Sequence, residues 1–236
     1  MLISCDASQL EFRVLVELAR DKIALDEILN GKDTHSLNQK AFNLPSRLIS
    51  KIYLFRTIFR GSGYSFSIDP DFIHVSDSPA YWDNVNKLFY EKYEGINDVH
   101  FKWKDMVLNG EAIQGPLGRF WKVEPFNKWG KINWTQFTNF PVQGTGADIM
   151  ALARVSFFMK LKKLGLERVI LLVSSVHDSI VVDTPSKHLQ LVTQLFYQVF
   201  QDLQMNIKKL FDYDWITPLA CEVKAGPNMK DMSLVQ

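Results

Sequence analysis

The sequence has 236 residues, which is enough for one large domain or two small ones. Its hydrophobic fraction of 47% and charged fraction of 22% are those of an ordinary globular protein, which excludes a disordered chain. Lys and Arg (27) almost balance Asp and Glu (26), and the net charge of +1 excludes a simple polybasic nucleic-acid binder. Two widely separated cysteines, no apolar run of membrane-spanning length and no signal-peptide pattern lead us to expect a cytoplasmic protein that binds no membrane.

Hydrophobic periodicity predicts short strands at both ends of the chain and helices between them. The predicted strands cover residues 2–5, 168–174, 179–183 and 219–224. The predicted helices begin at residue 8 and cover 35–42, 46–59, 81–109 (with a break at Gly95), 143–164 (after Pro141) and 187–211. Ser8 and Glu11 match a capping box, Gly61 and Gly63 are expected to end the 46–59 helix, and residues 64–79 have the composition of a loop. The pattern indicates an α+β fold in which a helical insertion interrupts a sheet.

Two aspartates follow or join predicted strands. Asp6 follows the first strand, and Asp178 lies in the hairpin turn between the strands at 168–174 and 179–183. Carboxylates on neighbouring strands are suited to hold Mg²⁺ ions, which stabilise phosphoryl transfer. An Asp beside a turn also commonly caps local backbone, so neither residue alone establishes a site.

A stripe of two cations and two aromatic rings is predicted on one helix face. Its members, spaced by four residues, are Arg47, Lys51, Phe55 and Phe59. Cations neutralise the charge of a triphosphate, and a ring packs against a sugar or base. The same spacing also fits an ordinary amphipathic helix whose rings face the core.

Taken in order, the motifs resemble those of the family A DNA polymerases, the bacterial DNA polymerase I kind. Residues 6–13 (DASQLEFR) are similar to the first signature motif D-Y-S-Q-I-E-L-R, and residues 33–35 (DTH) to the D-x-H that follows it. The stripe resembles R-x3-K-x3-F/Y-x3-Y-G on the fingers helix, and residues 139–149 resemble N-x-P-x-Q-G-T-A-A-D-I. Residues 176–179 (VHDS) and 222–228 resemble the third motif V-H-D-E and the C-terminal V-E-V-x-x-G-x-N-W.

This resemblance implies a polymerase palm, an antiparallel sheet backed by helices, with a mostly helical fingers insertion. It assigns residues 1–21 and 135–236 to the palm and residues 22–134 to the fingers. It also implies template-directed DNA synthesis, in which two Mg²⁺ ions assist transfer of a nucleotide from dNTP to the 3′-hydroxyl of a primer. The expected partners are primer–template DNA, dNTPs and an N-terminal polymerase chain that supplies a thumb.

The resemblance also assigns roles to single residues. Asp6, Asp178 and the backbone of Ala7 are expected at the metals, and Lys51 is expected to balance charge on the leaving pyrophosphate. The residues expected to contact the dNTP are Gln9, Glu11, His35, Arg47, Lys51, Phe55 and Phe59, with Glu11 excluding ribonucleotides. The residues expected to contact the DNA are Asn139, Gln143 and His177.

Several positions depart from the family pattern. Ser179 stands where a Glu is usual, so we expect two catalytic acids. Phe59 stands where a Tyr is usual, and Arg56 and Arg60 stand where glycines are usual, which predicts a stiffer fingers helix. The thumb and any exonuclease domain have no counterpart in the sequence, and we expect an exposed apolar surface and an unpaired strand edge where they would dock.

Two alternatives remain open. A single-subunit RNA polymerase also carries V-H-D-S, although Glu11 and the residues 143–149 argue against it. A catalytically silent DNA-binding or scaffold subunit would account for Ser179 and Phe59, but it gives no reason to keep both aspartates with Arg47 and Lys51.

Overall fold

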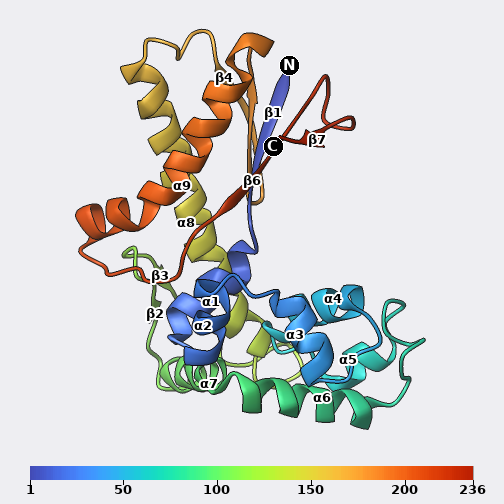
Figure 1. The fold of residues 1–236 in the computed structure, drawn as a ribbon. Helices are drawn as coiled ribbons and strands as arrows, with labels where there is room; N and C mark the ends of the chain where they lie inside the picture. The colour runs from blue at the N-terminus through green and yellow to red at the C-terminus, as the bar shows by residue number, and fades with distance from the viewer. Residues whose placement is uncertain (236) are drawn as a thin grey trace. The chain divides into compact units, whose positions relative to one another are not determined.

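The computed structural model describes residues 1–235 and has an α+β fold made of two compact units. Unit 1 comprises Met1–Glu11 and the chain from Gly144 onward, and unit 2 comprises Phe12–Gln143. The strands are β1 (Leu2–Ala7), β2 (Ile113–Gln114), β3 (Phe120–Trp121), β4 (Leu171–Val176), β5 (Ser179–Asp183), β6 (Cys221–Gly226) and β7 (Ser233–Leu234). The helices are α1 (Leu10–Ala19), α2 (Lys22–Leu29), α3 (Thr34–Ala41), α4 (Arg47–Thr57), α5 (Gly63–Ser67), α6 (Pro79–Lys92), α7 (Glu94–Leu108), α8 (Trp134–Lys163) and α9 (Leu189–Phe211), with a 3₁₀ turn over Ser186–His188 (Figure 1).

The sheet of unit 1 has the order β4-β5-β1-β6-β7, with each neighbouring pair antiparallel. β1 therefore lies in the middle and pairs with β5 on one side and β6 on the other. The strand continues through Ala7, which places Asp6 inside the strand and not after its end as the sequence predicted. The reason is that the main chain of Asp6 and Ala7 is still paired with β6.

One face of this sheet forms the core of unit 1 with α9 and the part of α8 that belongs to the unit (Figure 1). The apolar residues that alternate along the central strands are all buried: Ile3, Cys5, Ile180, Val182 and Val223. Phe157 of α8 and Phe196 of α9 stack with centroids 4.1 Å apart, which joins the two helices. The opposite face of β1 carries Ser4 and Asp6, because successive side chains of a strand point to opposite faces.

β4 lies at one end of the sheet and has one unpaired edge. It exposes Leu171, Val173 and Val176, whose exposed fractions are near one half. β4 and β7 form the two ends of the sheet, whereas β1, the strand that begins the chain, lies in its middle, so the unpaired edges do not belong to β1.

Unit 2 is built around aromatic side chains that α4 and α6 contribute. Tyr53 of α4 is fully buried and contacts Trp82 and Phe89 of α6, with ring centroids 6.0 and 6.3 Å away. The Tyr53 hydroxyl donates to Asn86 Oδ1 over 2.8 Å, so the one polar atom of the ring is satisfied. α4 begins as predicted, because Ser46 Oγ accepts a hydrogen bond from the amide of Ile49.

Four local predictions were wrong at helix boundaries. α1 begins at Leu10, because Gln9 has a φ of 51° and cannot be helical, and this removes the capping-box register of Ser8 and Glu11. α4 ends at Thr57, before the two glycines that were expected to end it, and Gly63 instead begins the short helix α5.

The remaining two concern Gly95 and Pro141. The helical break falls at Tyr93, and Gly95 lies in the first turn of α7, where its amide donates to Asp21 Oδ2 and a Cβ would approach the Cα of Asp21 to 2.9 Å. α8 runs through Pro141 for 30 residues, although a proline cannot donate the usual helical hydrogen bond. Phe137 and Val142, on either side of the proline, are fully buried.

Among the described residues, no helix combines the length and apolar composition needed to cross a membrane.

Candidate active site

The candidate residues fall into two groups, one in each unit. The group in unit 1 contains the two aspartates that the sequence predicted as metal ligands. The amide of Ala7 donates a hydrogen bond to the carbonyl oxygen of Asp178 over 2.9 Å, and Asp6 pairs in register with Ser179. Strand pairing therefore brings two acidic residues that are 172 positions apart in the sequence onto neighbouring strands, as predicted.

The turn that carries Asp178 is a tight hairpin. Val176 of β4 pairs with Ser179 of β5, which leaves His177 and Asp178 as its two central residues. His177 has a φ of 52°, a left-handed conformation that residues other than Gly, Asn and Asp rarely adopt. The hydroxyl of the buried Ser179 donates to the carbonyl of Val176 over 2.9 Å. Ser179, which stands where the family usually has Glu, thus stabilises the turn, and both His177 and Asp178 are exposed.

Two further residues lie on the same face as Asp6, and sequence reasoning assigned them no role. The buried Ser4 donates from Oγ to Asp6 Oδ2 over 3.2 Å, which orients the carboxylate. Glu222 of β6 pairs in register with Asp6, so the two acidic side chains point to the same face of the sheet. The contact of Ser4 with Asp6 could have been predicted, because residues two apart in a strand lie on the same face. The position of Glu222 depends on the register between β1 and β6, which no local sequence pattern encodes.

The donors of this group suit a hard cation, since carboxylate oxygens are the ligands that Mg²⁺ prefers. Within residues 1–235, no three His, Cys, Asp or Glu side chains are grouped closely enough to hold a metal ion by themselves. The carboxylates of this group are those of Asp6 and Asp178, the two predicted ligands, and of Glu222, which faces the same side of the sheet as Asp6. Gln9, with its left-handed φ of 51°, and Glu11, in the first turn of α1, follow directly after β1 in the same unit.

In unit 2, Asp33 joins the starts of two helices. It is the N-cap of α3, where its side chain accepts from the amide of His35, and it binds Arg47 at the first position of α4. Arg47 Nε and Nη2 donate to the two carboxylate oxygens of Asp33 over 2.6 and 3.1 Å. The hydrogen bonds from Arg47, followed by that from Ser36, hold the pKa of Asp33 well below its usual range. In the sequence Asp33 was identified only as part of a motif and was given no role. In the structure Asp33 binds Arg47, which was predicted to contact the triphosphate.

His35 is buried behind this ion pair. The hydroxyl of Ser50 on α4 donates to the main-chain carbonyl of His35 over 2.8 Å, and the His35 ring lies 6.4 Å from that of Phe55. Burial and the neighbouring Arg47 lower the pKa of His35, which keeps the ring neutral near pH 7. α3 and α4 thus bring together three predicted residues, His35, Arg47 and Phe55.

The stripe on α4 lies on the side of the helix away from its core. The buried residues of α4 are Ile49, Ser50, Tyr53, Leu54 and Thr57. Arg47 and Lys51 are exposed and Phe55 is half-buried, so the rings-inward amphipathic helix does not describe this face. Phe59 lies beyond the end of the helix at Thr57, in a turn closed by a bond from its amide to the carbonyl of Arg56, and so leaves the stripe.

The two arginines at usual glycine positions anchor the end of α4. Arg56 pairs with Asp69 and with Asp71, the latter at 2.9 Å. Arg60 has a φ of 61°, which explains why glycine suits this position. Its guanidinium carbon lies 4.0 to 4.9 Å from the ring centroids of three aromatic residues, and its nitrogens donate to His100 Nδ1 and Asn97 Oδ1 over 3.1 and 2.7 Å. These rings belong to Tyr90, Phe101 and Trp134.

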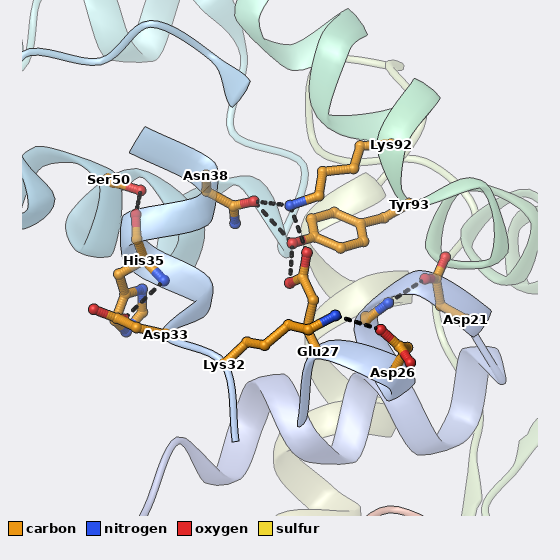
Figure 2. A network of polar contacts seen from close by, with 11 residues as sticks. Asp21, Asp26, Glu27, Lys32, Asp33, His35, Asn38, Ser50, Lys92 and Tyr93 are labelled. Atoms are coloured by element: carbon orange, nitrogen blue, oxygen red, sulfur yellow. Dashed lines mark hydrogen bonds and ion pairs between the residues drawn. The ribbon is translucent and has the colours of Figure 1, made fainter. Parts of the chain in front are cut away.

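A buried polar network fixes α3 from its other side (Figure 2). Lys92 Nζ lies 2.7 Å from Glu27 Oε1 and donates to Asn38 Oδ1 over 2.7 Å, and the Tyr93 hydroxyl lies 2.8 Å from oxygens of both Glu27 and Asn38. Glu27, Asn38 and Tyr93 are almost completely buried. The network therefore ties α3, which carries His35, to α2 and to the end of α6.

The residues predicted to contact DNA are divided between the units. Asn139 and Gln143 lie on the part of α8 that belongs to unit 2, and His177 lies in the hairpin of unit 1. The Oδ1 atom of Asn139 is buried and has no hydrogen-bond partner among residues 1–235, an unusual state for an amide oxygen. Gln143 is exposed.

Comparisons with known proteins agree on one family. The family model described as DNA polymerase family A matches residues 1–231. DNA polymerase I of Aquifex aeolicus is 26% identical over 80% of this chain and 33% of its own length, and the thermostable DNA polymerase I of Thermus aquaticus is 26% identical over 96% of this chain and 26% of its own. DNA polymerase I of Deinococcus radiodurans is 24% identical over 98% of this chain and 23% of its own length.

A solved structure gives the same answer for the fold. The POL domain of Pol1 from M. smegmatis, in complex with DNA primer-template and dNTP, superposes with a TM-score of 0.78 at 21% identity. The match covers 94% of this chain and 38% of that one. This chain thus spans about a quarter to a third of the curated relatives, and its α+β fold is that of a polymerase domain. With the family model matched over nearly the whole sequence, the chain belongs to DNA polymerase family A.

Proposed function

We propose that this chain carries the palm and fingers of a DNA polymerase and transfers a nucleotide from dNTP to the 3′-hydroxyl of a primer. Residues 1–21 and 135–236 would be the palm, which includes the whole of unit 1, and residues 22–134, which lie within unit 2, would be the fingers. The observation that carries the proposal is the hydrogen bond between Ala7 and Asp178, which unites the first and third motifs on one sheet. In the reaction the primer 3′-oxygen attacks the α-phosphorus of the dNTP. The bond between the α-phosphorus and the oxygen that bridges to the β-phosphate breaks, and pyrophosphate leaves.

Asp6 and Asp178 are the residues that would hold Mg²⁺, assisted by the main chain of Ala7. When bound, a pair of divalent ions stabilises negative charge on the attacking and leaving oxygens. Ser4 would keep Asp6 in one orientation through its 3.2 Å hydrogen bond, and Ser179 would keep Asp178 in place by closing the hairpin.

The exposed face of α4 would bind the nucleotide. Arg47 and Lys51 would contact the triphosphate, with Lys51 balancing charge on the leaving pyrophosphate, and Phe55 would pack on the sugar. His35, whose pKa is lowered in the free chain by burial and by Arg47, would be the third residue to contact the triphosphate. Gln9 and Glu11 would lie near the sugar, where Glu11 would exclude a 2′-hydroxyl.

The remaining predicted residues would contact the primer–template. Asn139 has a buried side-chain oxygen in need of a donor, and Gln143 and His177 are exposed. Phe59 would lie at the end of the nucleotide-binding face. The anchoring of α4 by Arg56 and Arg60 supports a fingers unit that is stiffer at this point than in relatives with glycine.

An N-terminal polymerase segment, with a thumb, would complete the enzyme. The chain spans about a quarter to a third of its curated relatives, and the unpaired, apolar edge of β4 offers a docking surface. We expect weak synthesis by this chain alone and strong synthesis when that segment is added in trans.

The test is extension of a labelled primer on a DNA template with Mg²⁺ and dNTPs, with and without the N-terminal segment. We expect extension by the native chain, loss in Asp178→Ala, and retention in Asp183→Asn, a matched exposed aspartate whose ion pair is with the N-terminal amine. Extension that persists in Asp178→Ala contradicts the assignment. Preference for rNTPs would indicate the RNA polymerase alternative, and absence of extension in both formats would indicate the silent DNA-binding subunit.

A further inference from the structure

A pre-formed turn at residues 126–132 of unit 2 has no role in the proposed chemistry. Phe126 and Ile132 form a β-bridge at its base, and the amide of Asn127 donates to the carbonyl of Lys131 over 2.8 Å. The Asn127 side-chain oxygen accepts from the amides of Trp129 and Lys131, over 3.0 and 3.1 Å. Gly130 adopts the left-handed φ of 72° that closes the turn. The backbone is thus fixed without a ligand, which reduces the entropy cost of binding one.

This turn presents an aromatic ring to solvent. Trp129 is 72% exposed and is the most exposed of the six tryptophans. Phe126 in the same turn is 52% exposed, and Phe120 on the preceding β2–β3 hairpin is 62% exposed. Three large rings exposed within ten residues of the sequence forgo the stabilisation that burial would provide, which is typical of a binding surface.

Positive charge accompanies these rings. Residues 115–131 contain four basic side chains and one acidic side chain, a net charge of +3, whereas the whole chain carries only +1. Lys128 Nζ lies over one face of the Trp129 ring, 4.4 Å from its centroid, which leaves the other face for a ligand. Lys128 and Lys131 are both exposed.

We propose that the 126–132 turn binds single-stranded DNA, with Trp129 stacking on a base and Lys128 and Lys131 contacting flanking phosphates. Rings that stack on any base, combined with cations that follow the backbone, are the two elements of sequence-independent single-strand binding. A protein-binding surface would instead be poor in lysine at its centre. If the proposed polymerase function holds, the bound strand is the template ahead of the primer terminus. The proposal that the turn binds single-stranded DNA does not depend on that function.

The test is the affinity of the 236-residue chain for a fluorescein-labelled oligothymidylate, measured by fluorescence anisotropy as a function of salt. We expect Trp129→Ala to weaken binding roughly 5- to 100-fold and Trp129→Phe to restore most of it, because a base stacks on either ring. The matched control is Phe211→Ala, another exposed aromatic, which lies beside the paired charges of Lys208, Asp212 and Asp214. This control is expected to bind as the native chain does.

The lysines give an independent readout. Each of Lys128→Gln and Lys131→Gln is expected to reduce the slope of log affinity against log salt by about 0.7, the value for one phosphate contact with a single strand. Lys208→Gln, whose ammonium is already paired with two aspartates, is expected to leave the slope unchanged. Equal affinities of Trp129→Ala and Phe211→Ala would overturn the proposal, as would an effect of Trp129→Ala on self-association of the chain without an effect on DNA binding.

Failure of this inference is distinguishable from failure of the proposed function. If primer extension is absent but single-strand binding depends on Trp129, the polymerase assignment fails and the binding turn stands. If extension depends on Asp178 but Trp129→Ala binds DNA like the control, the polymerase assignment stands and the turn has another role. If both hold, Trp129→Ala should weaken binding to a primer–template with a long single-stranded overhang and not to one with a blunt end.

Discussion

The amide of Ala7 donates a hydrogen bond to the carbonyl of Asp178 over 2.9 Å. This contact continues the β1–β5 pairing by one step beyond the pair of Asp6 and Ser179. It fixes the hairpin turn against the central strand, so the position of one candidate metal ligand depends on the position of the other. Any change that moves β1 relative to β5 is therefore expected to act on both aspartates at once.

The ion pair of Asp33 and Arg47 gives a prediction about nucleotide binding. We expect Asp33→Asn to weaken dNTP binding by roughly 3- to 10-fold, because Arg47 loses the two-point contact that orients it. The measurement is the dissociation constant for dNTP, obtained from quenching of tryptophan fluorescence. Asp26→Asn is the matched control, since Asp26 is an exposed aspartate paired with Lys32 and has no contact with Arg47. Equal weakening in both variants would show that the contact does not matter for the nucleotide.

The contact between Arg60 and His100 gives a prediction about acid stability. Burial, followed by the nearby Arg60, lowers the pKa of His100 well below its usual range. The unfolded chain therefore takes up a proton near pH 6.5 that the folded chain refuses, and stability is complete above that pH and falls as the pH drops below it. The slope from this group is at most about 1.4 kcal/mol per pH unit.

The check is the free energy of unfolding in urea between neutral pH and the onset of acid unfolding. His100→Gln is expected to reduce the acid dependence, because the amide oxygen can still accept from Arg60 but cannot take up a proton. His74→Gln, at an exposed position, is expected to leave the slope unchanged. The buried His35, whose pKa is also lowered, adds to the slope with the same sign and remains in both variants. A His100→Gln variant with the native slope would refute this explanation.

The buried pair of Glu27 and Lys92 gives a prediction about the stability of unit 2. Glu27→Gln should reduce the free energy of unfolding by about 2–3 kcal/mol, because it leaves the Lys92 ammonium without its carboxylate partner. The double variant with Lys92→Met should lose less than the two single variants added together. The exposed pair of Lys87 and Glu91 is the control, and Glu91→Gln is expected to cost no more than about 0.5 kcal/mol. If the loss in the free energy of unfolding in the double variant equals the sum of the losses in the two single variants, Glu27 and Lys92 are not coupled.

Much of the fold could be predicted where local chemistry determines it. The start of α4 was predicted to within one residue, and the long apolar period of α9 gave that helix almost to the residue. The errors arose where tertiary contacts decide. α8 continues through Pro141 and has fully buried residues on both sides of it, and Gly95 allows a close approach to Asp21 and does not end a helix.

In the candidate site, too, the residues could be proposed from the sequence, whereas the contacts between them depend on the tertiary structure. Motif order proposed Asp6, Asp178, Arg47 and His35 as candidates, but it did not show which residues contact them. Asp33 binds Arg47 because α3 and α4 begin side by side, and Glu222 faces Asp6 because of the β1–β6 register. Asp33 and Arg47 lie at the starts of separate helices, and Asp6 and Glu222 are far apart in the sequence. No local sequence pattern encodes either contact.

The most direct test of the paired aspartates is binding of Mn²⁺, a paramagnetic substitute for Mg²⁺, followed by electron paramagnetic resonance during titration of the metal-free chain. We expect the native chain to bind Mn²⁺ and so to lower the concentration of free Mn²⁺. Asp6→Asn and Asp178→Asn are each expected to abolish this binding. Asp183→Asn, which changes the carboxylate at the far end of β5, should bind as the native chain does. Native binding in both Asp6→Asn and Asp178→Asn would contradict the account, because the two carboxylates joined by the Ala7–Asp178 contact would then hold no metal.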